Sequence, residues 1–171
     1  WRSCPEDLEK ESPADSSRLR AGSAAIFGQA RARRKRTRQN SRMRLGSFDT
    51  LVRALDGAGV RYLVAGGLAV NAHGYLRFTR DVNVVLQLSP KNIASAFAAL
   101  DAVGYRPIVP VTAADFADPA RRAAWVRDKH MTVLNFWSEA HRDTPIDVFV
   151  TEPFDFEAEH ARALVKPLGP V

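Results

Sequence analysis

The sequence has few of the residues that build disulfide frameworks or metal sites made of cysteine and histidine. It contains one cysteine, Cys4, so no internal disulfide can form, and its four histidines form no metal-ligand motif. No apolar run approaches the length of a membrane span, and the apolar patch at residues 24–27 is too short for a signal-peptide core. From these absences we expect a reducing, cytoplasmic setting and no membrane partner.

Most of the chain also lacks an excess of charge, although the formal net charge is +6. Residues 1–44 hold 12 Lys/Arg and 5 Asp/Glu, whereas residues 45–171 hold 13 basic and 14 acidic residues. The basic balance therefore belongs to the N-terminal segment, and the remainder of the chain is nearly neutral. The apolar content of the whole chain, 46%, is normal for a globular protein with a packed core.

The N-terminal segment is rich in Ser, Glu, Arg and Gly and shows little apolar periodicity, which is typical of disorder. We predict a basic tail over residues 1–44 and one domain over residues 45–171. A protein that starts at Met43 should then melt at the same temperature as the full chain. The segment is interpreted either as a basic arm that neutralises nucleic-acid phosphates or as a segment foreign to the native protein.

From residue 47 onward, helical and strand periodicities alternate along the chain. Ser47 is placed as the N-cap of the first helix, Gly57 and Gly59 as its end, and Pro119 as a break within a later helix. The predicted fold is an α/β (α+β) domain, a small mixed sheet with flanking helices. Helices are expected over residues 47–59, 67–75, 89–104, 112–130 and 154–164, and extended segments over 60–66, 79–88, 105–111, 131–137 and 144–150.

Two glycines, Gly66 and Gly67, stand where a strand is predicted to end and a helix to begin. A helix start leaves backbone N–H groups unpaired, and glycine lets that backbone approach an anion. Such a pair is also typical of a plain tight turn. If it is a phosphate cradle, a bulky residue at Gly67 should abolish NTP binding while the fold stays intact.

Polar residues interrupt two of the apolar strands. Asp81 and Asn83 are two residues apart, so their side chains share one face of a strand, and Asp147 lies between Ile146 and Val148. An unpaired carboxylate is expensive to bury, so this face is unlike ordinary core. An acidic cluster on neighbouring strands beside a phosphate site suits divalent metal ions and a nucleotide.

In these features the chain resembles the polymerase-β-like nucleotidyltransferase superfamily in its minimal form. The resemblance covers about residues 48–159, is most specific in "GGLAVNAHGYLRFTRD", and looks closest to the nucleotidyltransferases of toxin–antitoxin and abortive-infection systems. It implies two Mg²⁺ ions, an NTP, and transfer of a nucleoside monophosphate to a protein or RNA hydroxyl. By this resemblance Asp81 and Asp147 are catalytic, Asp81, Asn83 and Asp147 are metal ligands, and Gly66, Gly67, Arg77 and Thr79 bind the nucleotide.

Two departures from the family pattern leave alternatives open. Asn83 stands where relatives carry a second carboxylate, and a neutral amide is a poorer ligand for a hard cation. Relatives also commonly continue with further helical structure, so a C-terminally truncated domain is one expectation. The alternatives to an active enzyme are a catalytically degenerate binding module, such as an antitoxin-like partner protein, and a nucleic-acid-binding protein that works through the basic arm.

Overall fold

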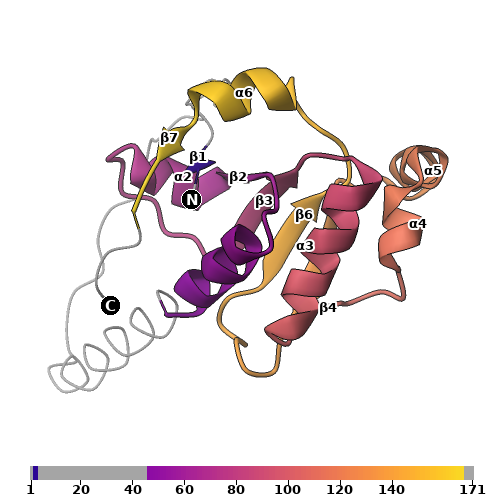
Figure 1. The fold of residues 1–171 in the computed structure, drawn as a ribbon, viewed down its shortest axis with the longest axis horizontal. Coiled ribbons are helices and arrows are strands. Elements are labelled where there is room, and N and C mark those ends of the chain that lie inside the picture. Colours follow the sequence, from indigo (N-terminus) through magenta and orange to yellow (C-terminus); the bar gives the residue numbers. More distant parts are fainter. Residues whose placement is uncertain (1, 4–45, 168–171) are drawn as a thin grey trace, which may run out of the picture.

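The computed structural model describes residues 2–3 and 46–167 (Figure 1). Its described strands form one mixed sheet in the order β4-β5-β6-β3-β2-β1-β7. The pairs β3 with β6 and β1 with β2 are parallel, and the others are antiparallel. The strands are β1 (Arg2–Ser3), β2 (Tyr62–Ala65), β3 (Val82–Leu86), β4 (Arg106–Pro107), β5 (Val133–Trp137), β6 (Ile146–Phe149) and β7 (Leu164–Val165).

The helices match the predicted segments, and with the sheet they confirm a mixed α/β fold. Pro119 divides one predicted helix into two, because Asp118 ends the first and caps the second by accepting hydrogen bonds from the amides of Ala120 and Arg121. The described helices are the helix of residues 46–57, α2 (Gly66–Ala72), α3 (Pro90–Ala102), α4 (Ala113–Ala117), α5 (Pro119–Lys129) and α6 (Phe156–Arg162).

Ser47 is not the N-cap of the first described helix. Residue 46 is already helical, so Ser47 lies inside the helix, and the residues before it are outside the described ranges. The predicted end is confirmed, because the helix stops at Gly57 and Gly59 adopts a φ of 64°. Only the apolar spacing was decisive here, since a serine near a helix start is as compatible with the first turn as with the cap.

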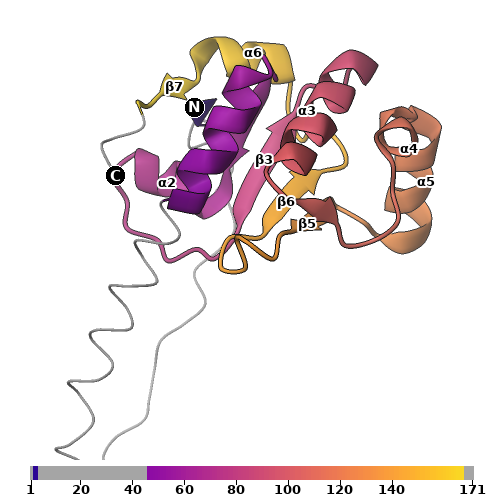
Figure 2. The ribbon, with the colours of Figure 1, turned by 60° about the horizontal axis from the view of Figure 1, so that its bottom comes forward.

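The main core lies on one face of the sheet, under the helix of residues 46–57 and α3 (Figure 2). Leu51 and Leu55 from that helix and Ile93 from α3 are almost completely buried. They meet the residues of β3 that point to the same side, Val82 and Val84. The period of two along β3 therefore assigns its even-numbered residues to this core.

A second, smaller core lies on the opposite face beneath α6. Phe156 of α6 packs with Leu63 of β2 and Val85 of β3. Asn83 points to the same side as Val85, two residues closer to the start of β3. This apolar cluster does not include Asn83, which lies opposite Asp147 of β6 at the edge of the cluster.

The short strand β1 is a departure from the sequence prediction. Ser3 is completely buried, pairs with Val64 of β2, and lies opposite Leu164 of β7. The Arg2 guanidinium donates to the carbonyl of His160 over 3.1 Å. The expectation that the N-terminal segment adds nothing to the fold is therefore wrong for residues 2–3, while the rest of residues 1–44 lies outside the described ranges. Strand β2 is buried along its whole length, so its backbone needs a partner on this side.

Removal of residues 1–42 should consequently lower the melting temperature, because the β2 edge then loses its partner. Thermal denaturation of the full chain and of a protein starting at Met43 measures the effect. Ser3→Asp in the full chain, which would place a charge at a buried strand position, should produce a drop of the same sign. An unchanged melting temperature in both proteins would contradict the pairing of β1.

Candidate functional site

A row of polar side chains crosses the sheet at the edge of the smaller core. Asn83 of β3 lies opposite Asp147 of β6, and Asn135 of β5 lies opposite Asp147 on the other side. Asp81 precedes Asn83 by two residues, and the Nδ2 of Asn83 is 3.5 Å from the Asp81 Oδ2. The structure thus brings together Asp81, Asn83 and Asp147, which the sequence analysis had linked across more than one element.

Each carboxylate of the row is held by neighbouring donors. The Thr79 hydroxyl donates to Asp81 Oδ1 over 3.0 Å, and Asn83 donates weakly to its other oxygen. Asn135 Nδ2 donates to Asp147 Oδ1 over 2.7 Å. Sequence reasoning missed Asn135, although it carries the same signal as Asp147, namely a polar residue between apolar neighbours in a strand.

The two carboxyl groups have pKa values that move in opposite directions. Burial raises the pKa of Asp147, and the negative charge of Asp81 raises it further against the lowering effect of the Asn135 hydrogen bond. Burial alone would also raise the pKa of Asp81, but hydrogen bonds from Thr79, the backbone and Asn83 outweigh it and lower that pKa. Asp81 is therefore the stronger acid, and Asp147 is the group that its charge disturbs.

An open pocket of about 400 Å³ lies beside Asp81. All four residues predicted to bind the nucleotide line it, and so does Arg80, which the sequence analysis left outside its predicted site. Its floor and walls combine a helix start, a loop and two strands. The lining residues are Gly66, Gly67, Arg77, Phe78, Thr79, Arg80, Asp81, Asn83 and Phe149.

The two glycines have a structural reason that is independent of any ligand. Gly66 adopts a φ of 64°, and a Cβ there would lie 2.8 Å from Asn83 Nδ2. A Cβ on Gly67 would lie 2.7 Å from the Cβ of Thr79. The glycines thus let α2 start in close contact with the residues that hold Asp81. Because even a Cβ at Gly67 would collide with Thr79, we now expect a bulky residue there to shift α2 or Thr79 and to destabilise the fold.

Gly66→Ala should destabilise the protein by about 2 kcal/mol or more, from the left-handed backbone and the collision with Asn83. Gly57→Ala is the matched control, since no atom lies within 4 Å of the added Cβ and the residue is helical. It should stabilise the protein by about 0.5–1 kcal/mol. Urea denaturation of both variants measures the difference, and equal effects would contradict the close approach at Gly66.

The donor set of the row consists of oxygen ligands for a hard cation. Among residues 2–3 and 46–167, no group of three or more His, Cys, Asp or Glu residues could hold a metal ion. The available ligands are the carboxylates of Asp81 and Asp147 and the amide oxygens of Asn83 and Asn135. Mg²⁺ is commonly bound through one or two carboxylates together with substrate phosphates, and this set fits that mode.

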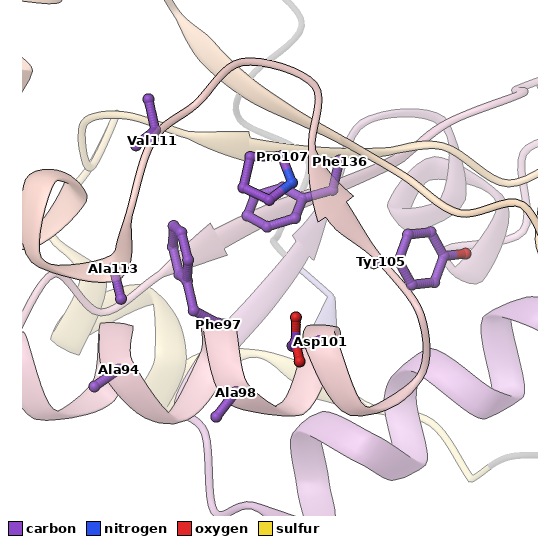
Figure 3. A pocket seen from close by; sticks show the side chains of 9 residues that line it. All are labelled: Ala94, Phe97, Ala98, Asp101, Tyr105, Pro107, Val111, Ala113 and Phe136. Atoms are coloured by element: carbon purple, nitrogen blue, oxygen red, sulfur yellow. The ribbon is translucent and has the colours of Figure 1, made fainter.

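A second hollow of about 410 Å³ lies on the opposite face of the sheet, between α3 and the segment of residues 105–113 (Figure 3). Its lining includes the aromatic side chains of Phe97, Tyr105 and Phe136. Its lining contains one charged residue, Asp101, which pairs with Arg106 over 2.6 Å. With no cation in its lining and the sheet between it and Asp147, this hollow is not a candidate phosphate site.

No helix in the described part of the chain is long and apolar enough to cross a membrane. Comparisons of the chain with family models, curated proteins and solved structures found no match. The interpretation of the site therefore depends on its own geometry.

Proposed function

We propose that the protein is a nucleotidyltransferase of the polymerase-β-like type, which binds an NTP with Mg²⁺ and transfers a nucleoside monophosphate to a hydroxyl of protein or RNA. One observation carries the proposal. Asp81 directly precedes β3 and lies beside Asn83, Asp147 of the parallel strand β6 lies opposite Asn83, and the charge of Asp81 raises the pKa of Asp147. A divalent cation relieves such repulsion, and the adjoining pocket supplies the cations that a triphosphate requires.

The residues of the site divide this work between them. Asp81 and Asp147, with the amide oxygens of Asn83 and Asn135, hold the metal, which when bound neutralises charge on the triphosphate. Arg77 and Arg80 are both exposed in the pocket wall, and Arg80, the residue next to Asp81, pairs with phosphate oxygens of the NTP. Thr79 holds Asp81 through its hydroxyl, so its main role is to position that carboxylate.

The transfer itself needs an acceptor for one proton. The acceptor hydroxyl oxygen forms a bond to the α-phosphorus, the bond from that phosphorus to the bridging oxygen breaks, and pyrophosphate leaves with the bonding electrons. The hydroxyl proton passes to a carboxylate. Asp81 and Asp147 are the two carboxylates of the site that could accept it.

The test is incubation with Mg²⁺ and each common NTP labelled at the α-phosphate, followed by a search for label on protein or RNA. Label should appear with α-labelled NTP, should be absent with γ-labelled NTP, and should disappear in Asp81→Asn. If no label is transferred from any of the NTPs and none of them binds, the proposal is contradicted.

A second candidate function is a catalytically degenerate module that binds a nucleotide or a partner protein, as an antitoxin-like protein does. Asn83 favours it, because a neutral amide stands where the family has a carboxylate and already donates to Asp81. This candidate predicts NTP binding without transfer of label. Recovery of transfer in Asn83→Asp would show that the amide alone separates the two functions.

A further inference from the structure

The segment that connects α2 to β3 exposes three large apolar or aromatic side chains within four residues. Tyr75 is 61% exposed, Leu76 is fully exposed and Phe78 is 76% exposed. Arg77 and Arg80 alternate with them and are exposed as well. The segment runs along the outside of the fold before it enters the sheet (Figure 2). Residues 75–80 are called the aromatic loop below.

Hydrogen bonds hold the backbone of the aromatic loop in place. Asn71 of α2 donates through Nδ2 to the Arg77 carbonyl over 2.9 Å, and the Arg77 amide donates back to Asn71 Oδ1 over 2.6 Å. The Tyr75 amide donates to the carbonyl of Val70 over 3.2 Å. The exposed rings therefore project from an ordered backbone, which lowers the entropy lost when a ligand binds.

The aromatic loop also forms one wall of the pocket beside Asp81. Arg77, Phe78 and Arg80 all line that pocket. The Arg80 guanidinium lies 5.9 Å from the centre of the Phe78 ring, so a cation and an aromatic face are presented together. Aromatic rings interleaved with cations are the combination that proteins use to bind single strands, with bases on the rings and phosphates on the arginines.

We propose that the aromatic loop binds single-stranded nucleic acid, with bases stacked on Phe78 and Tyr75 and phosphates paired with Arg77, while Arg80 faces the NTP. The loop carries positive charge and no acidic residue, which complements a phosphate backbone. The excess of basic residues in the N-terminal segment has the same sign. The bound strand is then the acceptor, and its terminal hydroxyl reaches the pocket. This last statement rests on the proposed function, whereas the binding surface does not.

The binding surface is tested by fluorescence anisotropy with a short labelled oligouridine and the matching DNA, without NTP or metal, on the full chain. Phe78→Ala should weaken binding by about fivefold or more, while Phe78→Trp should retain it. Arg77→Gln should reduce the slope of log affinity against log salt by about 0.7. Ile108→Ala, at an exposed apolar residue outside the loop, and Arg127→Gln, at an exposed arginine of α5, are the matched controls and should change neither quantity.

If the wild type, Phe78→Ala and Arg77→Gln bind the oligonucleotide with equal affinity, the proposed binding surface is wrong. The proposal is also wrong if Leu76→Ala loses as much affinity as Phe78→Ala while Arg77→Gln leaves the salt slope unchanged, because that pattern is typical of an apolar protein interface. Transfer of label to RNA is measured separately. If oligonucleotide binding depends on Phe78 but no label is transferred, the binding surface is supported and the acceptor role is contradicted. If Phe78→Ala transfers label to RNA with the wild-type KM for RNA, the binding surface alone is contradicted.

Discussion

Replacement of Asn83 by aspartate is expected to lower the stability of the metal-free protein and to strengthen its response to Mg²⁺. The new carboxylate would lie opposite Asp147 in the register of β3 and β6 and would replace the amide that donates to Asp81. Like charges at this distance repel and raise one another's pKa. We expect a loss of about 1–2 kcal/mol in the free energy of unfolding without metal.

The same substitution supplies the anionic ligand that the row lacks, so Mg²⁺ should bind more tightly and any transfer should be faster. The loss of stability should diminish as the pH falls below the raised carboxyl pKa values, because protonation removes the repulsion. Thermal denaturation at several Mg²⁺ concentrations and pH values measures both effects. Asn83→Ala is the control, since it removes the amide without adding charge and should not increase the metal dependence.

If Asn83→Asp changes neither the metal-free melting temperature nor its dependence on Mg²⁺, the metal-site interpretation of β3 is wrong. If stability falls but Mg²⁺ does not restore it, the three side chains are close together but do not form a cation site. The two effects have opposite signs in one variant, which separates proximity from metal binding.

Neutralisation of the two aspartates should affect stability in opposite directions, and under the proposed function it should abolish transfer in both cases. The pKa of Asp147 is raised, so its contribution to stability is fully present at acidic pH and is lost as the pH rises through its folded-state pKa. Asp147→Asn should therefore stabilise the metal-free protein at neutral pH, and the gain should vanish below the ordinary carboxyl pKa, at about pH 4.

Asp81 behaves in the opposite way, because its pKa is lowered. Its contribution to stability is present above the ordinary carboxyl pKa and is lost as the pH falls through the folded-state value. Asp81→Asn should therefore destabilise the protein at neutral pH. Melting curves between acidic and neutral pH, with the exposed Asp143→Asn as control, measure the contrast. If Asp81→Asn and Asp147→Asn change the melting temperature equally, the opposite pKa shifts of the two carboxyl groups are contradicted.

Local patterns in the sequence determined much of the fold. The helices were predictable because apolar side chains three and four residues apart must share one buried stripe, and β3 because its even-numbered valines alternate with Asp81 and Asn83. The polar residues of the site were also recognisable, since a carboxylate or amide inside an apolar strand contradicts simple burial. These inferences use only residues close together in the chain.

The tertiary structure decided what depends on partners distant in sequence. The register of β3 with β6 placed Asn83 beside Asp147, and that of β5 with β6 added Asn135. Packing of α2 against β3 gave the glycine pair its steric reason, and the position of α6 decided which part of the sheet face is covered. Strand β1 was unpredictable because two residues carry no periodicity, and only the buried edge of β2 shows why they pair there. Strand register, the close approach of α2 to β3 and the covering of the sheet by α6 arise only when the whole chain packs. No short segment encodes them alone.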